Sequence, residues 1–177
     1  WLFDIPGIYY HSKLESLFTK NEIKQLVVGT KLNPISHTLL PGETGLIGGF
    51  CRIDVQNTES ISDGKLQLEL FMNRTLPYFR KPSVWKADEA IEALQGIQVN
   101  PPPSLCPPIF ESCADPRRSF FKLNPALSFQ LEPGLSSEAV LSDNLGWITF
   151  KSEHPVQITV SLPSGINASL RPCAFQV

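Results

Sequence analysis

The sequence has few charged residues and no long run of basic ones. Lysine, arginine, aspartate and glutamate make up 18% of its 177 residues, and the formal net charge is −2. No stretch holds more than two basic residues in succession. Binding to a nucleic-acid backbone needs lysine and arginine concentrated on one surface. We therefore expect no nucleic acid among the partners of this chain.

Long apolar segments are also missing. No window reaches the roughly eighteen apolar residues that a membrane-spanning helix needs, so we expect no direct membrane insertion by these residues. The chain begins at Trp1, and nothing in it resembles a signal peptide. We expect it to be a processed product or a piece of a longer protein.

Signatures of catalysis and of cofactor binding are missing as well. The chain has no Gly-x-Ser-x-Gly motif, and "GETGLIGG" (42–49) lacks the Lys-Ser/Thr pair of a phosphate-binding loop. None of the three histidines lies near a cysteine in the sequence, so no zinc-ligand spacing exists. We predict no cofactor, no metal site and no enzymatic activity. A hydrolase whose site assembles only in three dimensions, with His37 or His154, stays open as an alternative.

Cysteine is scarce, and the four residues allow three pairings, which the sequence leaves open. Cys51 and Cys173 lie in alternating apolar stretches, where a cysteine is either a small hydrophobe or a disulfide partner. Cys106 and Cys113 flank "PPIFES" in the most proline-dense stretch, where missing backbone N–H groups prevent regular strand pairing. We predict that these two form a disulfide that fixes a protruding loop. It would contribute about 2.5 kcal/mol by restricting the unfolded chain.

What the sequence does contain is apolar alternation with a period of two, beginning near residue 45. It is clearest in "CRIDV" (51–55) and "KLQLELFMN" (65–73), which we interpret as an antiparallel hairpin closed by the turn dipeptide Asp63-Gly64. Further strand-like runs follow at residues 119–123, 127–132, 146–151, 156–162 and 168–177. Their spacing predicts a mainly β fold, an antiparallel β-sandwich or a jelly roll.

Helical patterns are confined to two regions. At the N-terminal end, "SKLESLF" and "TKNEIKQLVVG" each open with a capping box and predict one bent helix or two short ones, before a loop that runs to residue 44. A second short helix is predicted at 86–96. We expect a single domain of residues 1–177, in which a helical and loop segment, 1–44, packs on a sandwich formed by 45–177.

Candidate binding residues lie in segments predicted as loops. Tyr78, Arg80 and Trp85 belong to "TLPYFRKPSVW", where aromatic and basic residues alternate in a way that suits protein or sugar recognition. Arg117 and Arg118 follow the proline-rich loop and would suit a carboxylate, as in a sialic-acid-like group. Asn73 and Asn167 begin Asn-x-Ser/Thr sequons and are candidate glycosylation sites.

These observations favour a non-enzymatic recognition module displayed on a cell or virion surface, for example an adhesin domain or a capsid spike. Its partner would be a protein or a glycan held by the loops, and a homo-oligomer is compatible with the sequence. The main alternative is a structural β-rich subunit of a larger assembly, which would cover broad apolar faces with its partners.

Overall fold

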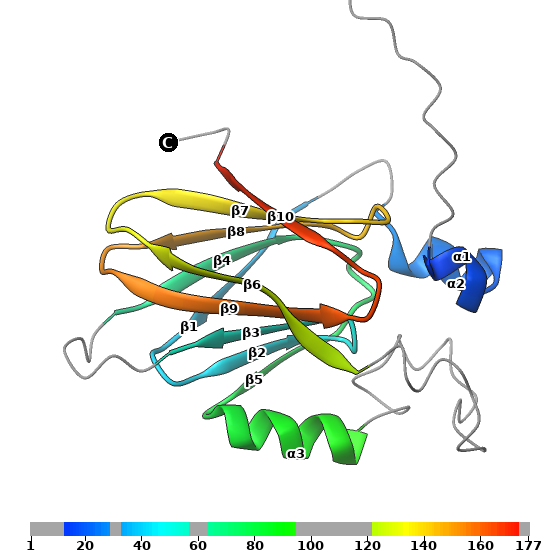
Figure 1. Ribbon diagram of the computed structural model, residues 1–177, viewed down its shortest axis with the longest axis horizontal. Coiled ribbons are helices and arrows are strands. Elements are labelled where there is room, and N and C mark those ends of the chain that lie inside the picture. The colour runs from blue at the N-terminus through cyan, green and yellow to red at the C-terminus, as the bar shows by residue number, and fades with distance from the viewer. Residues whose placement is uncertain (1–12, 29–32, 57–63, 95–121, 174–177) are drawn as a thin grey trace, which may run out of the picture.

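A computed structural model describes residues 13–28, 33–56, 64–94 and 122–173. Within these ranges the chain forms two antiparallel sheets of five strands and three short helices (Figure 1). Sheet A has the strand order β1 (Ile35–Leu39), β4 (Leu66–Phe71), β8 (Gly146–Ser152), β7 (Ser136–Leu141) and β10 (Ala168–Pro172). Sheet B has the order β5 (Tyr78–Lys81), β2 (Thr44–Ile47), β3 (Cys51–Val55), β9 (Val156–Pro163) and β6 (Leu123–Leu131). The predicted mainly β fold of layered antiparallel sheets is confirmed, whereas the jelly-roll variant stays a prediction.

The core lies between the two sheets. Alternate residues of β4 and β3 are buried and their neighbours are more exposed, as the period of two requires. Phe150 of β8 and Phe50, which precedes β3, are the largest of the fully buried side chains. Because both sheets contribute to one continuous apolar cluster, each sheet has one face in the core and one face directed outward.

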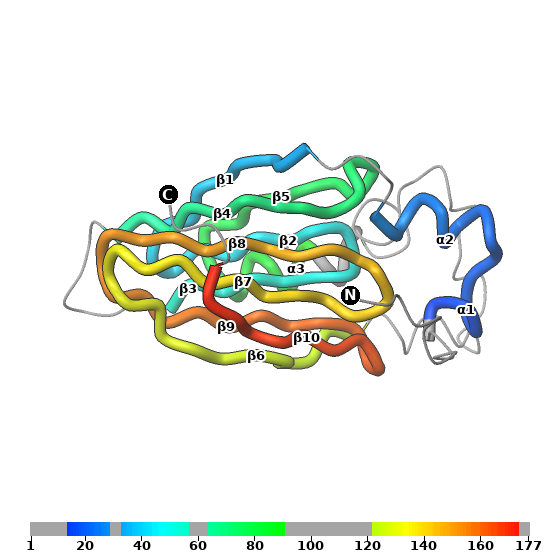
Figure 2. The backbone as a smooth tube through the Cα atoms, turned by 90° about the horizontal axis from the view of Figure 1, so that it is seen from above, coloured from blue at the N-terminus to red at the C-terminus, as the bar shows by residue number. Residues whose placement is uncertain are grey.

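Helices α1 (Lys13–Leu17) and α2 (Lys20–Leu26) lie at one end of the sandwich (Figures 1 and 2). Thr19 and Glu22 form the predicted capping box at the start of α2. Leu14, Phe18 and Leu26 are buried in the same cluster as the sheets, and the Phe18 ring lies 6.3 Å from that of Phe50. The helical segment therefore closes this end of the core.

The end of α2 is held by the sequon at Asn73. Nδ2 of Asn73 donates to the carbonyl of Val27 at 2.9 Å and to that of Lys24 at 3.3 Å. Thr75 Oγ1 donates to the carbonyl of Gln25 at 2.7 Å, and the Thr75 N–H donates to Oδ1 of Asn73. The last carbonyls of a helix have no partner within it, so these side chains satisfy groups that would otherwise need water.

Helix α3 (Val84–Leu94) covers part of the outer face of sheet B (Figure 1). Ala87 and Ala90 pack against Leu46 of β2 and Phe79 of β5. The helix begins two residues before the predicted start at residue 86, because Ser83 Oγ accepts from the N–H of Lys86 and so caps an earlier turn.

The predicted hairpin of residues 51–55 and 65–73 is wrong. Strand β3 pairs with β2 and β9 in sheet B, and β4 pairs with β1 and β8 in sheet A. Both strands turn their apolar residues toward the same core, so the alternation identified the buried side chains correctly. It did not reveal that the chain changes sheets between the two strands.

Several strands lie where the sequence predicted loops. Strand β1 falls within the segment 31–45, β2 begins at the end of that segment, and β5 falls within 75–85. These strands are short and are bounded by proline or glycine, which in the sequence predict turns. Strand β7 begins with the polar residues of "SSEAVL" and becomes a strand through its pairing with both β8 and β10.

Candidate functional site

Two of the residues singled out in the sequence lie on β5. Tyr78 is half-buried, and its ring stacks on that of His37 from β1, with 3.6 Å between the centroids. Strands β1 and β5 are edges of opposite sheets, so this stack lies where the two sheets meet. Arg80 is exposed and lies 3.6 Å from a carboxylate oxygen of Glu43.

Trp85 is the most exposed of the large apolar side chains in the described residues, at 59%. It lies on α3, where Nζ of Lys86 is 4.3 Å from the ring centroid. Tyr78, Arg80 and Trp85 do not line either of the hollows described below. Their role in recognition stays a prediction.

Other predicted residues lie outside the described ranges. These are Arg117, Arg118 and the predicted disulfide pair Cys106 and Cys113. Cys51 is a buried free thiol in β3. Burial, with a further contribution from the charge of Asp54, raises its pKa, so it behaves as the small hydrophobe that the sequence allowed.

The two sequons have different surroundings. The amide nitrogen of Asn73 already donates to two carbonyls of the α2 segment, and a glycan on this nitrogen would replace one of its hydrogens. Asn167 is exposed in the turn before β10, and its backbone exchanges hydrogen bonds with Ser142. Glycosylation at either position stays a prediction, and the geometry favours Asn167.

The hydroxyl of Tyr78 is buried and has no hydrogen-bond partner among the described residues. We expect Tyr78→Phe to raise the free energy of unfolding by about 0.5–1 kcal/mol at pH 7, because an unsatisfied polar atom is removed while the ring stack remains. Burial raises the pKa of Tyr78 to about 12, with Arg80 opposing and Glu43 adding to the shift. A raised pKa means that the folded state retains the proton, so wild-type stability falls as the pH rises above 10.

Urea unfolding at pH 7 and at several values between 10 and 12 measures this difference. The stability advantage of Tyr78→Phe should increase across that range. Tyr78→Leu is the control, because it removes the stack on His37 as well as the hydroxyl and should destabilise. A phenylalanine variant less stable than wild type at pH 7 would show that the hydroxyl has a partner.

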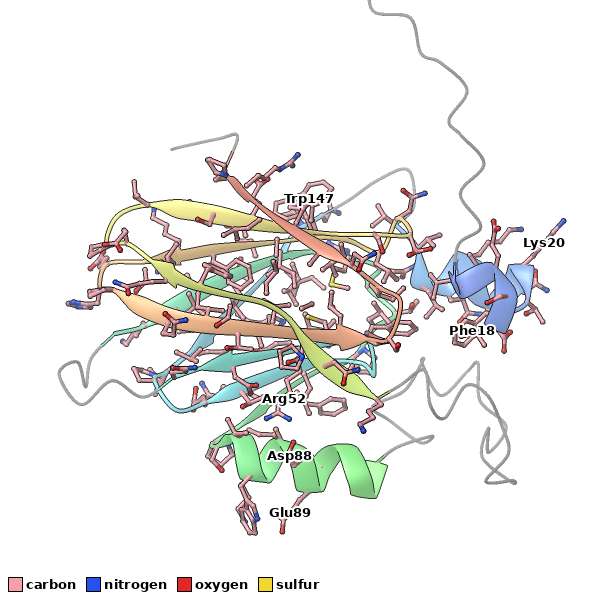
Figure 3. The ribbon with its side chains drawn as sticks, viewed as in Figure 1. Phe18, Lys20, Arg52, Asp88, Glu89 and Trp147 are labelled. Atoms are coloured by element: carbon pink, nitrogen blue, oxygen red, sulfur yellow. The ribbon has the colours of Figure 1, made fainter. Side chains whose placement is uncertain are left out.

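The outer face of sheet A carries a hollow of about 280 Å³, just below the roughly 300–1,000 Å³ of typical small-ligand sites. We call it the aromatic hollow. It is lined by outward side chains of β4, β8, β7 and the β10 region, arranged in cross-strand rows. The first row pairs Phe71 with Trp147, whose rings stack with 4.7 Å between their centroids. Figure 3 shows Trp147 projecting from sheet A on the side away from the core.

The second row places a buried carboxylate in the hollow. It runs from Glu69 through Thr149 and Glu138 to Arg171. Glu138 is only 4% exposed although it lies on an outward face. One of its oxygens accepts from Arg171 Nε at 2.7 Å, and the other accepts from Cys173 Sγ at 3.2 Å. The pairing with arginine stabilises the buried charge.

Arg171 also offers donors to a ligand. Its guanidinium is half-exposed and contacts Glu138 through Nε. Its two terminal nitrogens have no hydrogen-bond partner in the described part of the chain. A guanidinium held by a carboxylate on one side and open on the other is a preorganised donor.

A second hollow, of about 500 Å³, adjoins the first. We call it the cationic hollow, because Lys65, Lys151 and His154 contribute to its lining. The two hollows share Gln67 and Lys151, which face each other across β4 and β8. The two hollows therefore meet at this pair of residues, and together they are here called the sheet A groove.

The two histidines considered for a hydrolase lie in different places. His37 is half-buried against Tyr78, and burial lowers its pKa. His154 is exposed in the turn after β8, where its N–H donates to Ser152 Oγ. Neither histidine contacts a carboxylate in the described ranges.

The described ranges hold no group of three or more His, Cys, Asp or Glu side chains placed to bind a metal. They also hold no helix that is long and apolar enough to cross a membrane.

Sequence reasoning identified Gln67, Glu69 and Phe71 as the outward set of β4 but assigned them no function. Phe71 is an aromatic residue on an otherwise polar face of β4, and this was the one signal of the groove in that strand.

No known family model matches the chain, and no curated protein matches it in sequence.

Proposed function

We propose that this protein is a non-enzymatic recognition module that binds a glycan in the sheet A groove. The observation that carries the proposal is the aromatic hollow, in which the stacked Phe71–Trp147 pair lies beside the buried Glu138–Arg171 pair. Sugar rings present C–H groups on one face and hydroxyls at the edge. An aromatic ring next to carboxylate and guanidinium groups complements both kinds of surface.

A glycan suits the groove better than a peptide strand does. Strands β4, β8 and β7 each pair on both sides, so their backbone groups are already hydrogen-bonded within sheet A. A peptide added as a strand needs a free sheet edge, which these strands lack. Recognition in the groove must therefore use side chains. The binding surface that we propose is a sheet face, in place of the loops favoured by the sequence.

Glycoside hydrolysis is a second candidate. Glu69 and Glu138 flank Thr149 in one row, so their strands are separated by about 9–10 Å, or two strand spacings. Two carboxyl groups roughly 6.5–9.5 Å apart are typical of inverting glycosidases. Such an enzyme also needs one protonated carboxyl group as general acid. Both oxygens of Glu138 already accept hydrogen bonds, from Arg171 and Cys173, so this side chain is engaged within the protein, which favours binding without cleavage.

Display on a cell or virion surface is part of the proposal and depends on the predicted disulfide and sequons. A structural subunit of a larger assembly is the alternative. A subunit of that kind would cover a broad apolar face, whereas the outer face of sheet A carries charged and polar rows.

A glycan microarray probed with the labelled protein, followed by calorimetric titration of the strongest hit, tests the proposal. We expect Trp147→Ala to weaken binding at least about tenfold, which corresponds to about 1.4 kcal/mol. Trp85→Ala is the matched control, because it removes an exposed tryptophan from α3, outside the groove, and should leave affinity unchanged. Circular dichroism should show both variants folded.

Two results would contradict the proposal. The first is the absence of any binding on the array. The second is a loss of affinity in Trp85→Ala but not in Trp147→Ala, which would place the site on α3. Release of shorter sugars from the bound oligosaccharide, detected by chromatography, would favour the hydrolase.

A further inference from the structure

The cationic hollow has a charge character that the aromatic hollow lacks. Lys65 and Lys151 are both exposed, and neither has an ion-pair partner in the described residues. His154 lies beside them, and Glu153 is the one acidic residue in this lining. Two lysine ammonium groups that share a hollow repel each other, and an anion bound between them would relieve the repulsion.

The aromatic hollow, in contrast, is not positive. Arg171 is paired with Glu138, and the carboxylate of Glu69 balances the charge of Lys151, which lines both hollows. The groove thus carries an aromatic end with balanced charges and a cationic end. Trp147 and Lys151 are four residues apart on β8, which separates the two ends by about 13 Å. A short oligosaccharide can span this distance, and the difference in charge would fix its direction.

We infer that the glycan is acidic and that its carboxylate or sulfate group binds between Lys65 and Lys151. This inference rests on the proposed function, because it concerns a second part of the same groove. The neutral sugar ring contacts Trp147, and the charged group contacts the lysines. The cationic hollow therefore determines specificity, whereas the aromatic hollow provides binding that neutral and acidic glycans share.

The test uses an array that carries the same oligosaccharides with and without a terminal sialic acid, a uronic acid or a sulfate ester. We expect the wild-type protein to bind an acidic member at least about tenfold more tightly than its neutral counterpart. The double variant Lys65→Gln/Lys151→Gln should lose that preference, so that the ratio of acidic-sugar to neutral-sugar affinity falls to about one. The matched control Lys86→Gln/Lys122→Gln removes the same charge from exposed positions outside the groove and should keep the preference.

The outcomes separate the two proposals. Equal binding of neutral and acidic sugars overturns the acidic-ligand inference and leaves the glycan-binding function standing. Loss of the preference in both double variants also overturns it, because net charge and not the cationic hollow would be responsible. Absence of binding to every sugar overturns the proposed function and the inference with it.

Discussion

Replacing Gly146 by alanine is expected to lower the free energy of unfolding by about 3–5 kcal/mol. Gly146 is buried at the start of β8, and its φ of +109° is a conformation that residues with a β-carbon rarely adopt. A β-carbon here would lie 2.0 Å from the carbonyl oxygen of Phe71 and 2.9 Å from Cγ2 of Val28. The backbone of β4 would have to move, and with it both the Phe71–Trp147 stack and the contact to the helical segment.

The matched control is Gly134→Ala. Gly134 also has a positive φ, +73°, but a β-carbon there would have no atom within 4 Å. This variant should lose only about 1 kcal/mol, the cost of the left-handed backbone. Urea unfolding of both variants separates backbone strain from steric contact. Equal losses in the two variants would mean that β4 and β8 are not in close contact at Gly146.

The second large effect is expected for Arg52→Ala, which should lower the free energy of unfolding by about 2–4 kcal/mol. Nε of Arg52 donates to both carboxylate oxygens of Asp54 at 2.9 Å, and Nη1 contacts Asp88 of α3 (Figure 3). The side chains of Arg52 and Asp54 are 12% and 15% exposed. Burial opposes the charge of Arg52, but its hydrogen bonds and charge interactions with Asp54 and Asp88 raise its pKa.

Removal of the guanidinium leaves the carboxylate of Asp54 with Thr44 Oγ1 as its one remaining side-chain donor in the described part of the chain. A largely buried carboxylate that has lost its charged partner is costly. Arg80→Ala is the control. Arg80 is exposed on β5, the edge strand of the same sheet, and its removal should change stability by less than about 0.5 kcal/mol. Chemical denaturation followed by circular dichroism measures both. A loss for Arg52→Ala no larger than that for Arg80→Ala would show that the Arg52–Asp54–Asp88 contacts contribute little.

The sequence predicted the parts of this fold that depend on local periodicity. The alternation in "KLQLELFMN" correctly gave Leu66, Leu68 and Leu70 as core residues and the intervening residues as outward. Asp143-Asn144 is a local turn signal of the same kind, and both residues have a φ of +57°, as the tight turn between β7 and β8 requires. These features are encoded within a few consecutive residues.

Strand partners are encoded differently and were not predicted. Phe71 pairs with Trp147 across β4 and β8, although the two residues are far apart in the sequence. The partner of a strand depends on which apolar faces pack together across the whole core. No local pattern contains that information.

The groove was missed for the same reason. Its rows form only when β4, β8, β7 and β10 lie side by side, and each strand by itself shows ordinary polar residues. Glu138 in particular reads in the sequence as a solvated side chain, yet it is buried and paired with Arg171. A recognition surface built across a sheet is therefore harder to predict than one carried by a single loop.

The most direct measurement is a crystal structure of the protein with the tightest-binding oligosaccharide from the array. We expect a sugar ring against Trp147, hydrogen-bonded within the row of Glu138 and Arg171, with the chain of sugars directed toward Lys151. A ligand bound at α3 beside Trp85, or between the loops, with the outer face of sheet A empty, would contradict it.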